Sequence, residues 1–147
     1  MKKHLFTIFL AMAASAVTAQ TLTSPDGMLK TEFSLDAQGR PTYNLSFKGT
    51  TVVADSHLGF LLQGENADMA DFCTGFKVAG VDHASFDETW KPVWGEESEI
   101  RNHYNEMTVR LDQPRSERSL VVRFACSTTV WDSAMSFPRA RTLYTLL

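Results

Sequence analysis

Between residues 22 and 124, apolar and polar residues alternate in short segments with a period of two. In the segment 29–35, Leu29, Thr31, Phe33 and Leu35 alternate with Lys30, Glu32 and Ser34. Successive side chains of a β-strand point to opposite faces, so this pattern predicts a strand with one apolar face. Further short strands are predicted at 42–47, 51–53, 58–62, 76–81, 107–112 and 119–124.

Short polar segments separate these strands. The segment Asp36–Arg40 predicts a hairpin turn in which Gly39 adopts a positive φ, and Gln113–Glu117 predicts another turn. The polar stretch Gly64–Asp71 is expected to be a loop. About seven short strands joined in this way indicate an all-β fold, an antiparallel β-sandwich.

The segment 86–106 differs from the rest in composition. It holds Trp90 and Trp94, with Pro92 and Gly95 beside them, and five carboxylates between residues 87 and 99. Proline and glycine both oppose a helix, and no stripe of period 3.6 fits the segment. It predicts the end of one strand, a tryptophan-containing loop and the start of the next strand.

The residues of this segment resemble a known family. The strings D-E-T-W-K-P-V-W-G-E and I-R-N-H-Y-N-E, together with L-T-S-P-D-G at 22–27, are similar to the N-terminal domain of glycoside hydrolase family 97. That family contains multidomain α-glucosidases and α-galactosidases of carbohydrate-degrading bacteria. The resemblance covers residues 22–124 and ends abruptly after Phe124.

The resemblance implies a fold and a partner. In this family the N-terminal domain is a galactose-mutarotase-like β-supersandwich that packs on a (β/α)8 barrel, and the barrel carries the catalytic glutamates and a calcium ion. A barrel needs about 250 residues, so the 147 residues of this chain cannot hold one beside a sandwich. The resemblance therefore implies an incomplete sandwich at 22–124 with no catalytic residue, no metal and no cofactor of its own. Its expected partners are carbohydrate and the barrel of the same enzyme.

Five residues of the 86–106 segment are candidates for sugar binding: Trp90, Trp94, Arg101, Asn102 and His103. Aromatic rings stack on pyranose faces, and planar polar groups form hydrogen bonds with hydroxyls. Two alternatives remain open. The tryptophans are equally explained as buried anchors of the loop, and alternate members of the 101–105 row as residues that point into the sandwich and satisfy loop backbone groups.

The N-terminus has the pattern of an export signal. Lys2 and Lys3 precede the apolar run 5–14, and the small-residue site Val17-Thr18-Ala19 follows. This pattern predicts a signal peptide at 1–19, cleaved before Gln20, and an exported product in the periplasm or beyond. The apolar run is too short for a membrane span, which needs about 20 residues. The net charge of −3 gives no reason to expect a nucleic-acid partner.

The tail 125–147 no longer resembles the family, and we interpret it as translated out of frame. One permitted codon choice for residues 125–138, read from its third base, encodes Leu-Phe-Asp-Asp-Gly-Val-Gly-Phe-Arg-Tyr-Glu-Phe-Pro. That string is a turn followed by an alternating strand, as the family would show after residue 124. Loss of one base near codon 125 would explain why the resemblance ends after Phe124. The tail is then expected to be poorly ordered, with no evolved role for Cys126 or Trp131. Core residues such as Phe33, Phe47 and Val109 are then expected to be incompletely covered.

Three functions are compatible with the residues. The first is a non-catalytic fragment of an exported α-glycoside hydrolase, and the second is a free-standing secreted sugar-binding module. The third is a small mutarotase-like enzyme in which His103 and a carboxylate act as acid and base.

Overall fold

The chain folds into two antiparallel sheets. The structure is a computed structural model that describes residues 19–63 and 71–138. Within these ranges it contains no helix, and therefore none long and apolar enough to cross a membrane. The strands are β1 (Gln20–Thr23), β2 (Leu29–Leu35), β3 (Pro41–Phe47), β4 (Thr50–His57), β5 (Lys77–Trp90), β6 (Ile100–Gln113), β7 (Arg118–Ser127) and β8 (Trp131–Ser136). The predicted signal peptide and most of the predicted loop 64–71 lie outside the described residues.

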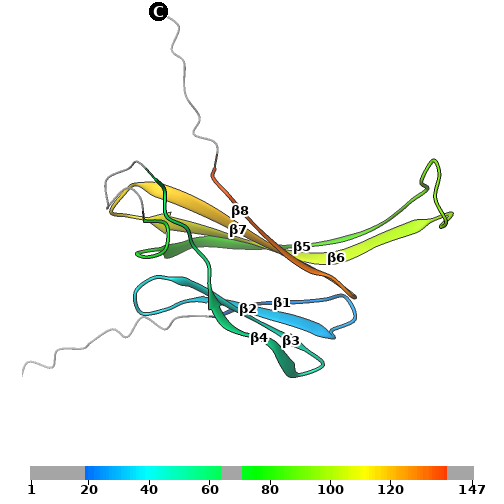
Figure 1. The fold of residues 1–147 in the computed structure, drawn as a ribbon, viewed down its shortest axis with the longest axis horizontal. Helices are drawn as coiled ribbons and strands as arrows, with labels where there is room; N and C mark the ends of the chain where they lie inside the picture. Colours follow the sequence, from blue (N-terminus) through cyan, green and yellow to red (C-terminus); the bar gives the residue numbers. More distant parts are fainter. Residues whose placement is uncertain (1–18, 64–70, 139–147) are drawn as a thin grey trace, which may run out of the picture.

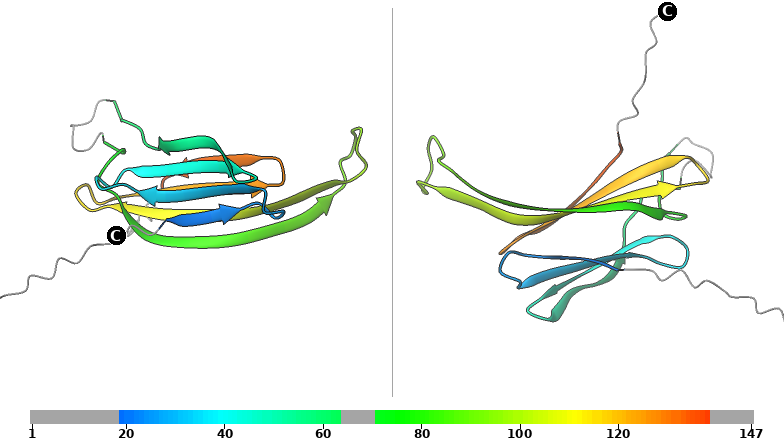
Figure 2. Two further views of the ribbon diagram at one scale, coloured as in Figure 1. Left: turned by 90° about the horizontal axis from the view of Figure 1, so that it is seen from below. Right: turned by 180° about the vertical axis from the view of Figure 1, so that it is seen from behind.

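Each sheet is a meander of four consecutive strands. The strand orders are β1-β2-β3-β4 and β5-β6-β7-β8, and every neighbouring pair is antiparallel. The two sheets lie face to face as two layers (Figures 1 and 2). The predicted all-β antiparallel sandwich is confirmed.

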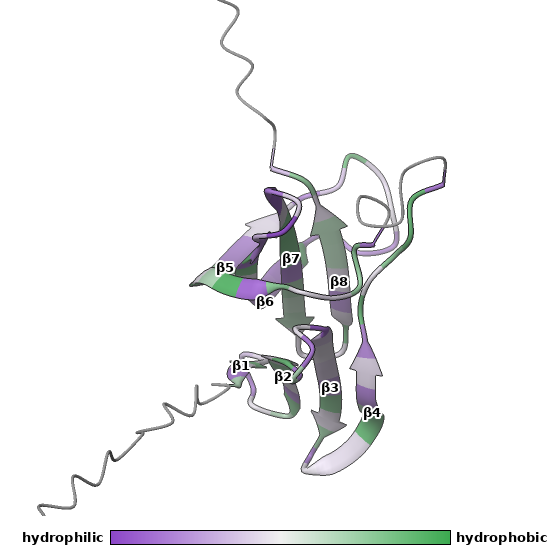
Figure 3. Cartoon of the chain, turned by 90° about the vertical axis from the view of Figure 1, so that its left-hand side faces the viewer, coloured by the Kyte–Doolittle hydropathy of each residue, from purple (hydrophilic) through white to green (hydrophobic). Residues whose placement is uncertain are grey.

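The core lies between the two layers. The β6–β7 hairpin supplies most of it, and Leu22 and Phe33 contribute from the opposite sheet; the fully buried hairpin residues are Met107, Val109, Leu111, Leu120, Val122, Phe124 and Cys126. Hydrophobic and hydrophilic residues alternate along these strands (Figure 3), as the period of two predicts. The expectation of incomplete cover is wrong for Phe33 and Val109, which are fully buried because the second layer lies over them. It holds for Phe47, which is 39% exposed.

The turn between β2 and β3 also joins the two halves of the chain. Gly39 has a φ of 69°, as predicted, and a Cβ built on it would lie 2.7 Å from the carbonyl oxygen of Phe76. The backbone N–H of Phe76 donates to the Gly39 carbonyl at 3.0 Å. Only glycine combines this φ with this close approach. The turn therefore fixes where the chain enters β5.

Two predicted strands differ from the observed ones. Residues 58–62 form only an isolated bridge between Leu61 and Asp71. The strand predicted at 76–81 is instead the first part of β5, which continues to Trp90. From residue 82 onward every β5 residue is exposed, so burial imposes no alternation there that a sequence pattern would reveal.

The expectation of a poorly ordered tail is wrong for residues 125–138. Strand β7 continues past Phe124 to Ser127, and β8 pairs with it from Cys126↔Trp131 to Val121↔Ser136. Cys126 is buried, and burial raises the pKa of its thiol to about 11. Trp131 stacks on Tyr43 with ring centroids 5.2 Å apart. An extended segment pairs with a free strand edge through its backbone, which largely explains why this segment is ordered. Residues 139–147 lie outside the described part.

Candidate functional site

The candidate sugar-binding residues lie on a projection of the second sheet. Strand β7 pairs with β6 only from Tyr104↔Ser127 inward, so the ends of β5 and β6 pair only with each other. We call residues 86–104 the arm: a two-stranded ribbon closed by the loop 91–99. It extends well beyond the sandwich (Figures 1 and 2). The predicted order of strand end, tryptophan loop and next strand is confirmed.

The strand register divides the arm into two faces. The pairs Phe86↔Tyr104, Glu88↔Asn102 and Trp90↔Ile100 share one face, whereas Asp87↔His103 and Thr89↔Arg101 share the other. Of the candidate sugar-binding residues, Trp90 and Asn102 therefore lie on one face and Arg101 and His103 on the opposite one. Trp94 lies in the loop. The structure does not bring the five together into one site.

The second face carries an ion pair with defined geometry. Arg101 donates from Nε and Nη2 to the two carboxylate oxygens of Asp87, each at 2.7 Å. These hydrogen bonds lower the pKa of Asp87 and raise the pKa of Arg101. A general base works best with a pKa near the operating pH. The pKa of Asp87, which pairs in register with His103, is lowered further from that range, and both of its carboxylate oxygens accept hydrogen bonds from Arg101.

Both tryptophans of the arm are exposed. The side chain of Trp94 is 91% exposed and that of Trp90 is 52% exposed. The alternative that they are buried anchors of the loop is therefore wrong for the structure described here. The physical reason is that no second layer lies over the arm, so its loop has nothing to pack against.

The interpretation that alternate residues of the 101–105 row point into the sandwich holds for Asn105. Its Nδ2 donates to the carbonyl oxygen of Thr23 at 2.8 Å. This bond joins β6 to β1, the edge strand of the other sheet, and satisfies a backbone group that has no strand partner on that side.

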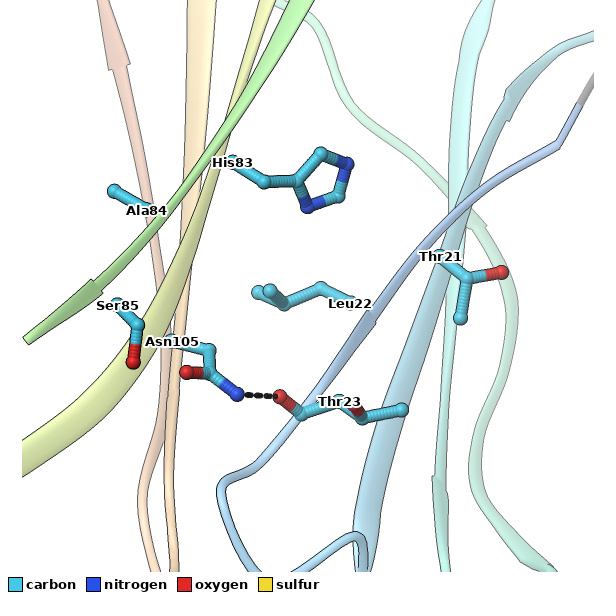
Figure 4. Close-up of a pocket in the computed structure, with 7 residues that line it drawn as sticks. All are labelled: Thr21, Leu22, Thr23, His83, Ala84, Ser85 and Asn105. Carbon is cyan, nitrogen blue, oxygen red and sulfur yellow. Dashed lines mark hydrogen bonds between the residues drawn. The ribbon is translucent and has the colours of Figure 1, made fainter.

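A polar groove lies beside this bond, between the edge strands β1 and β5. It has a volume of about 390 Å³ and is lined by Thr21, Leu22, Thr23, His83, Ala84, Ser85 and Asn105. In Figure 4, His83 and Leu22 face the space between the two strands. Sequence reasoning missed this groove because its two sides are far apart in the chain. No phenylalanine, tyrosine or tryptophan lines it, so it lacks the aromatic faces on which sugars most often stack.

No group of three or more histidine, cysteine, aspartate or glutamate residues suited to a metal ion occurs in the described ranges. Both cysteines, Cys73 and Cys126, are free thiols. The calcium ion that the family resemblance implies belongs to the catalytic barrel and not to this domain.

The comparisons with known proteins agree with the fold and with the arm motif. The family model for the glycosyl-hydrolase 97 N-terminal domain matches residues 22–129. The chain therefore belongs to glycoside hydrolase family 97, as a member of its N-terminal domain family. The match continues past Phe124, where the resemblance in the sequence was expected to end.

Individual relatives share only this region with the chain. A retaining alpha-galactosidase of Bacteroides thetaiotaomicron is 33% identical over 118 residues, which are 75% of this chain and 16% of the relative. A family 97 enzyme of Pseudoalteromonas sp. strain K8, solved in complex with panose, is 32% identical with a TM-score of 0.72. That alignment covers 84% of this chain and 18% of the solved one. A beta-arabinopyranosidase structure shares the fold at 22% identity and a TM-score of 0.70.

The chain thus spans less than a fifth of the length of these relatives. In them, the domain accompanies the remainder of a carbohydrate-active enzyme. The matched part is the N-terminal domain, and no barrel occurs in the described residues.

Proposed function

We propose that this chain is the non-catalytic N-terminal domain fragment of an exported α-glycoside hydrolase, whose catalytic barrel it packs against and whose substrate cleft it borders. The observation that carries the proposal is the family match over residues 22–129, combined with coverage of only 16% of the alpha-galactosidase.

The purified chain is expected not to hydrolyse α-glycosides. Such hydrolysis needs two carboxyl groups placed across a scissile bond, and in the resemblance these belong to the barrel. The measurement is release of nitrophenol from nitrophenyl α-galactoside and α-glucoside, beside the alpha-galactosidase as a positive control. Turnover above a matched blank would show that the chain carries chemistry of its own.

A free-standing sugar-binding module is the second candidate, because the exposed Trp94 and Trp90 rings are free to stack on a pyranose. A glycan-binding experiment on the same purified protein distinguishes the sugar-binding module from the non-catalytic fragment. Retention on immobilised glycans that is lost in Trp94→Ala would favour this second candidate over the fragment.

The mature chain is expected to begin at Gln20, where β1 also begins. The basic start, short apolar run and Val17-Thr18-Ala19 site are typical of signal-peptidase cleavage. The intact mass of the product recovered from the periplasm of a bacterial host tests this. A mass that retains residues 1–19 would contradict the cleavage, and absence of the product from the periplasm would contradict the exported location.

A further inference from the structure

The polarity of the second sheet reverses where the arm begins. Over the sandwich, Met107, Val109 and Leu111 of β6 face the other layer, and the alternate residues, such as Arg110, face outward. Arg110 forms an ion pair with Asp82 of β5 on that outer face. This is the ordinary arrangement of a sandwich sheet, with the apolar face inward and the polar face outward.

The same alternation continues without a register shift into the arm. The inward face there consists of polar residues, with Asn105, His103 and Arg101 following Met107 in steps of two. The outward face becomes apolar and aromatic, with Tyr104 and Ile100 opposite Phe86 and Trp90. The arm is therefore built with its apolar side pointing away from the sandwich core.

This outer face is ordered and only partly covered. The rings of Phe86 and Tyr104 stack with centroids 4.8 Å apart, and Trp90 lies beside Ile100 across the ribbon. Phe86, Trp90 and Ile100 are all exposed, and the loop adds the exposed Val93 and Trp94. Two apolar pairs thus flank the polar Glu88–Asn102 pair on this face. A two-stranded ribbon is marginally stable in water on its own, and exposed apolar side chains gathered on one face mark an interaction site.

We propose that the outer face of the arm (Phe86, Trp90, Ile100 and Tyr104) docks on the part of the same enzyme that follows this domain in its relatives. The proposal rests on the proposed function and names the surface that would carry out its packing role. The occupant follows from length: this chain matches only 18% of the solved Pseudoalteromonas chain, in the N-terminal domain. Most of such an enzyme is therefore polypeptide that lies outside the matched region and is available to cover the arm.

The chemistry of the arm specifies its partner surface. A sugar alone would require several hydrogen-bonding groups beside the rings, but apart from the polar atoms of Tyr104 and Trp90 the outer face offers only Glu88 and Asn102, and these lie 3.5 Å from each other. The loop carries Glu96 and Glu97, while Lys91 is paired with Glu99 at 3.0 Å. The complementary surface is therefore apolar at its centre, with lysine or arginine at the edge that receives the loop.

The test uses a chimera in which this chain replaces the matching segment of the Bacteroides alpha-galactosidase. The double substitution Trp90→Ser and Ile100→Ser is compared with Val52→Ser and Leu61→Ser, two exposed apolar residues outside the arm. The arm pair is expected to lower the thermal-unfolding midpoint of the chimera by at least about 4 °C, as loss of an interface hot spot would, and to reduce α-galactoside hydrolysis. The control substitutions are expected to leave the unfolding midpoint and the hydrolysis rate of the chimera unchanged. The conservative variant with Trp90→Phe and Ile100→Val is expected to retain most of the thermal stability of the chimera.

The isolated chain provides the necessary second measurement. There the arm pair is expected to leave the unfolding midpoint unchanged, because the outer face has no partner. Three results would overturn the docking proposal. The first is an equal drop of the unfolding midpoint in the isolated chain, and the second is no drop specific to the arm substitutions in the chimera. The third is a dimer of the isolated chain that dissociates when Trp90 and Ile100 are replaced by serine. If the chimera with the unchanged arm neither folds nor hydrolyses, the proposed function itself fails.

Discussion

Replacing Phe124 with alanine is expected to lower the free energy of unfolding by about 3–5 kcal/mol. The Phe124 side chain is fully buried at the centre of the sandwich. Its ring lies 5.7 Å from that of Phe33, 6.3 Å from that of Tyr43 and 6.1 Å from that of Trp131, as measured between centroids. Alanine would remove contacts to both layers and leave a cavity that neighbouring rings in two sheets cannot readily fill. Urea unfolding followed by circular dichroism measures the loss.

Val52→Ala is the matched control for this substitution. Val52 lies on β4, where its side chain is 61% exposed, so the change is expected to stay within about 0.5 kcal/mol. If Phe124→Ala were no more harmful than this control, the packing between the two sheets would not be what stabilises the fold.

The second large effect concerns β8, which is ordered but poorly matched to its position. Residues 128–130 connect β7 to β8; the backbone N–H of Ser127 donates to the Val130 carbonyl at 2.8 Å, so Thr128 and Thr129 form a two-residue turn. Hairpins of this length favour Asn-Gly or Asp-Gly with positive φ, and neither threonine is among the residues with positive φ.

The inner face of β8 is equally unsuited to a core. The indole Nε1 of Trp131 is buried with no hydrogen-bond partner in the described structure, which is costly for a polar group. Ser133 pairs with Phe124, so the side chain beside the central ring is a small hydroxyl. With one base restored at codon 125, the permitted codon choice given above would place valine, phenylalanine and tyrosine at positions 131, 133 and 135, and Asp-Asp-Gly at 128–130.

We therefore expect the gene to show a one-base loss near codon 125. Sequencing of the gene and its downstream region from the source genome measures this directly. The expected result is an alternative frame that stays open after codon 124 and runs into a barrel-encoding stretch. If that frame closes within a few codons, the tail is a divergent but genuine C-terminus and the out-of-frame interpretation is wrong.

Burial explains which parts of the fold were predictable from sequence. Strand β2 has one face against the core, so Thr31 and Phe33 stand out from Lys30 and Glu32, and the strand is found correctly. The outer half of β5 has no buried face, so its pattern does not show that the strand predicted at 76–81 continues without a break to the strand end predicted in the 86–106 segment. Strand β8 was missed for a different reason: it is held by backbone pairing with β7, which side-chain patterns do not report.

The sequence predicted the candidate site only in part, because it does not show how the site residues are arranged in space. The row Arg101–Asn105 is contiguous in sequence, but the strand places Arg101 and His103 on one face and Asn102 on the other. The exposure of Trp90 and Trp94 depends on whether a second layer reaches the arm, and composition alone does not fix that. The Asn105–Thr23 bond joins residues from different sheets, so no local signal predicts it.

The meander order of the two sheets has a consequence for biogenesis. Residues 20–57 contain every strand of the first sheet, so a growing chain completes it before β5 has been synthesised. Pairing between sequence neighbours is fast, whereas joining distant segments is slow. Until β6 and β7 emerge, Leu22 and Phe33 present an apolar face to their surroundings, which is a surface for chaperones to bind. The rate-limiting event of folding is therefore expected to be the docking of one finished sheet onto the other.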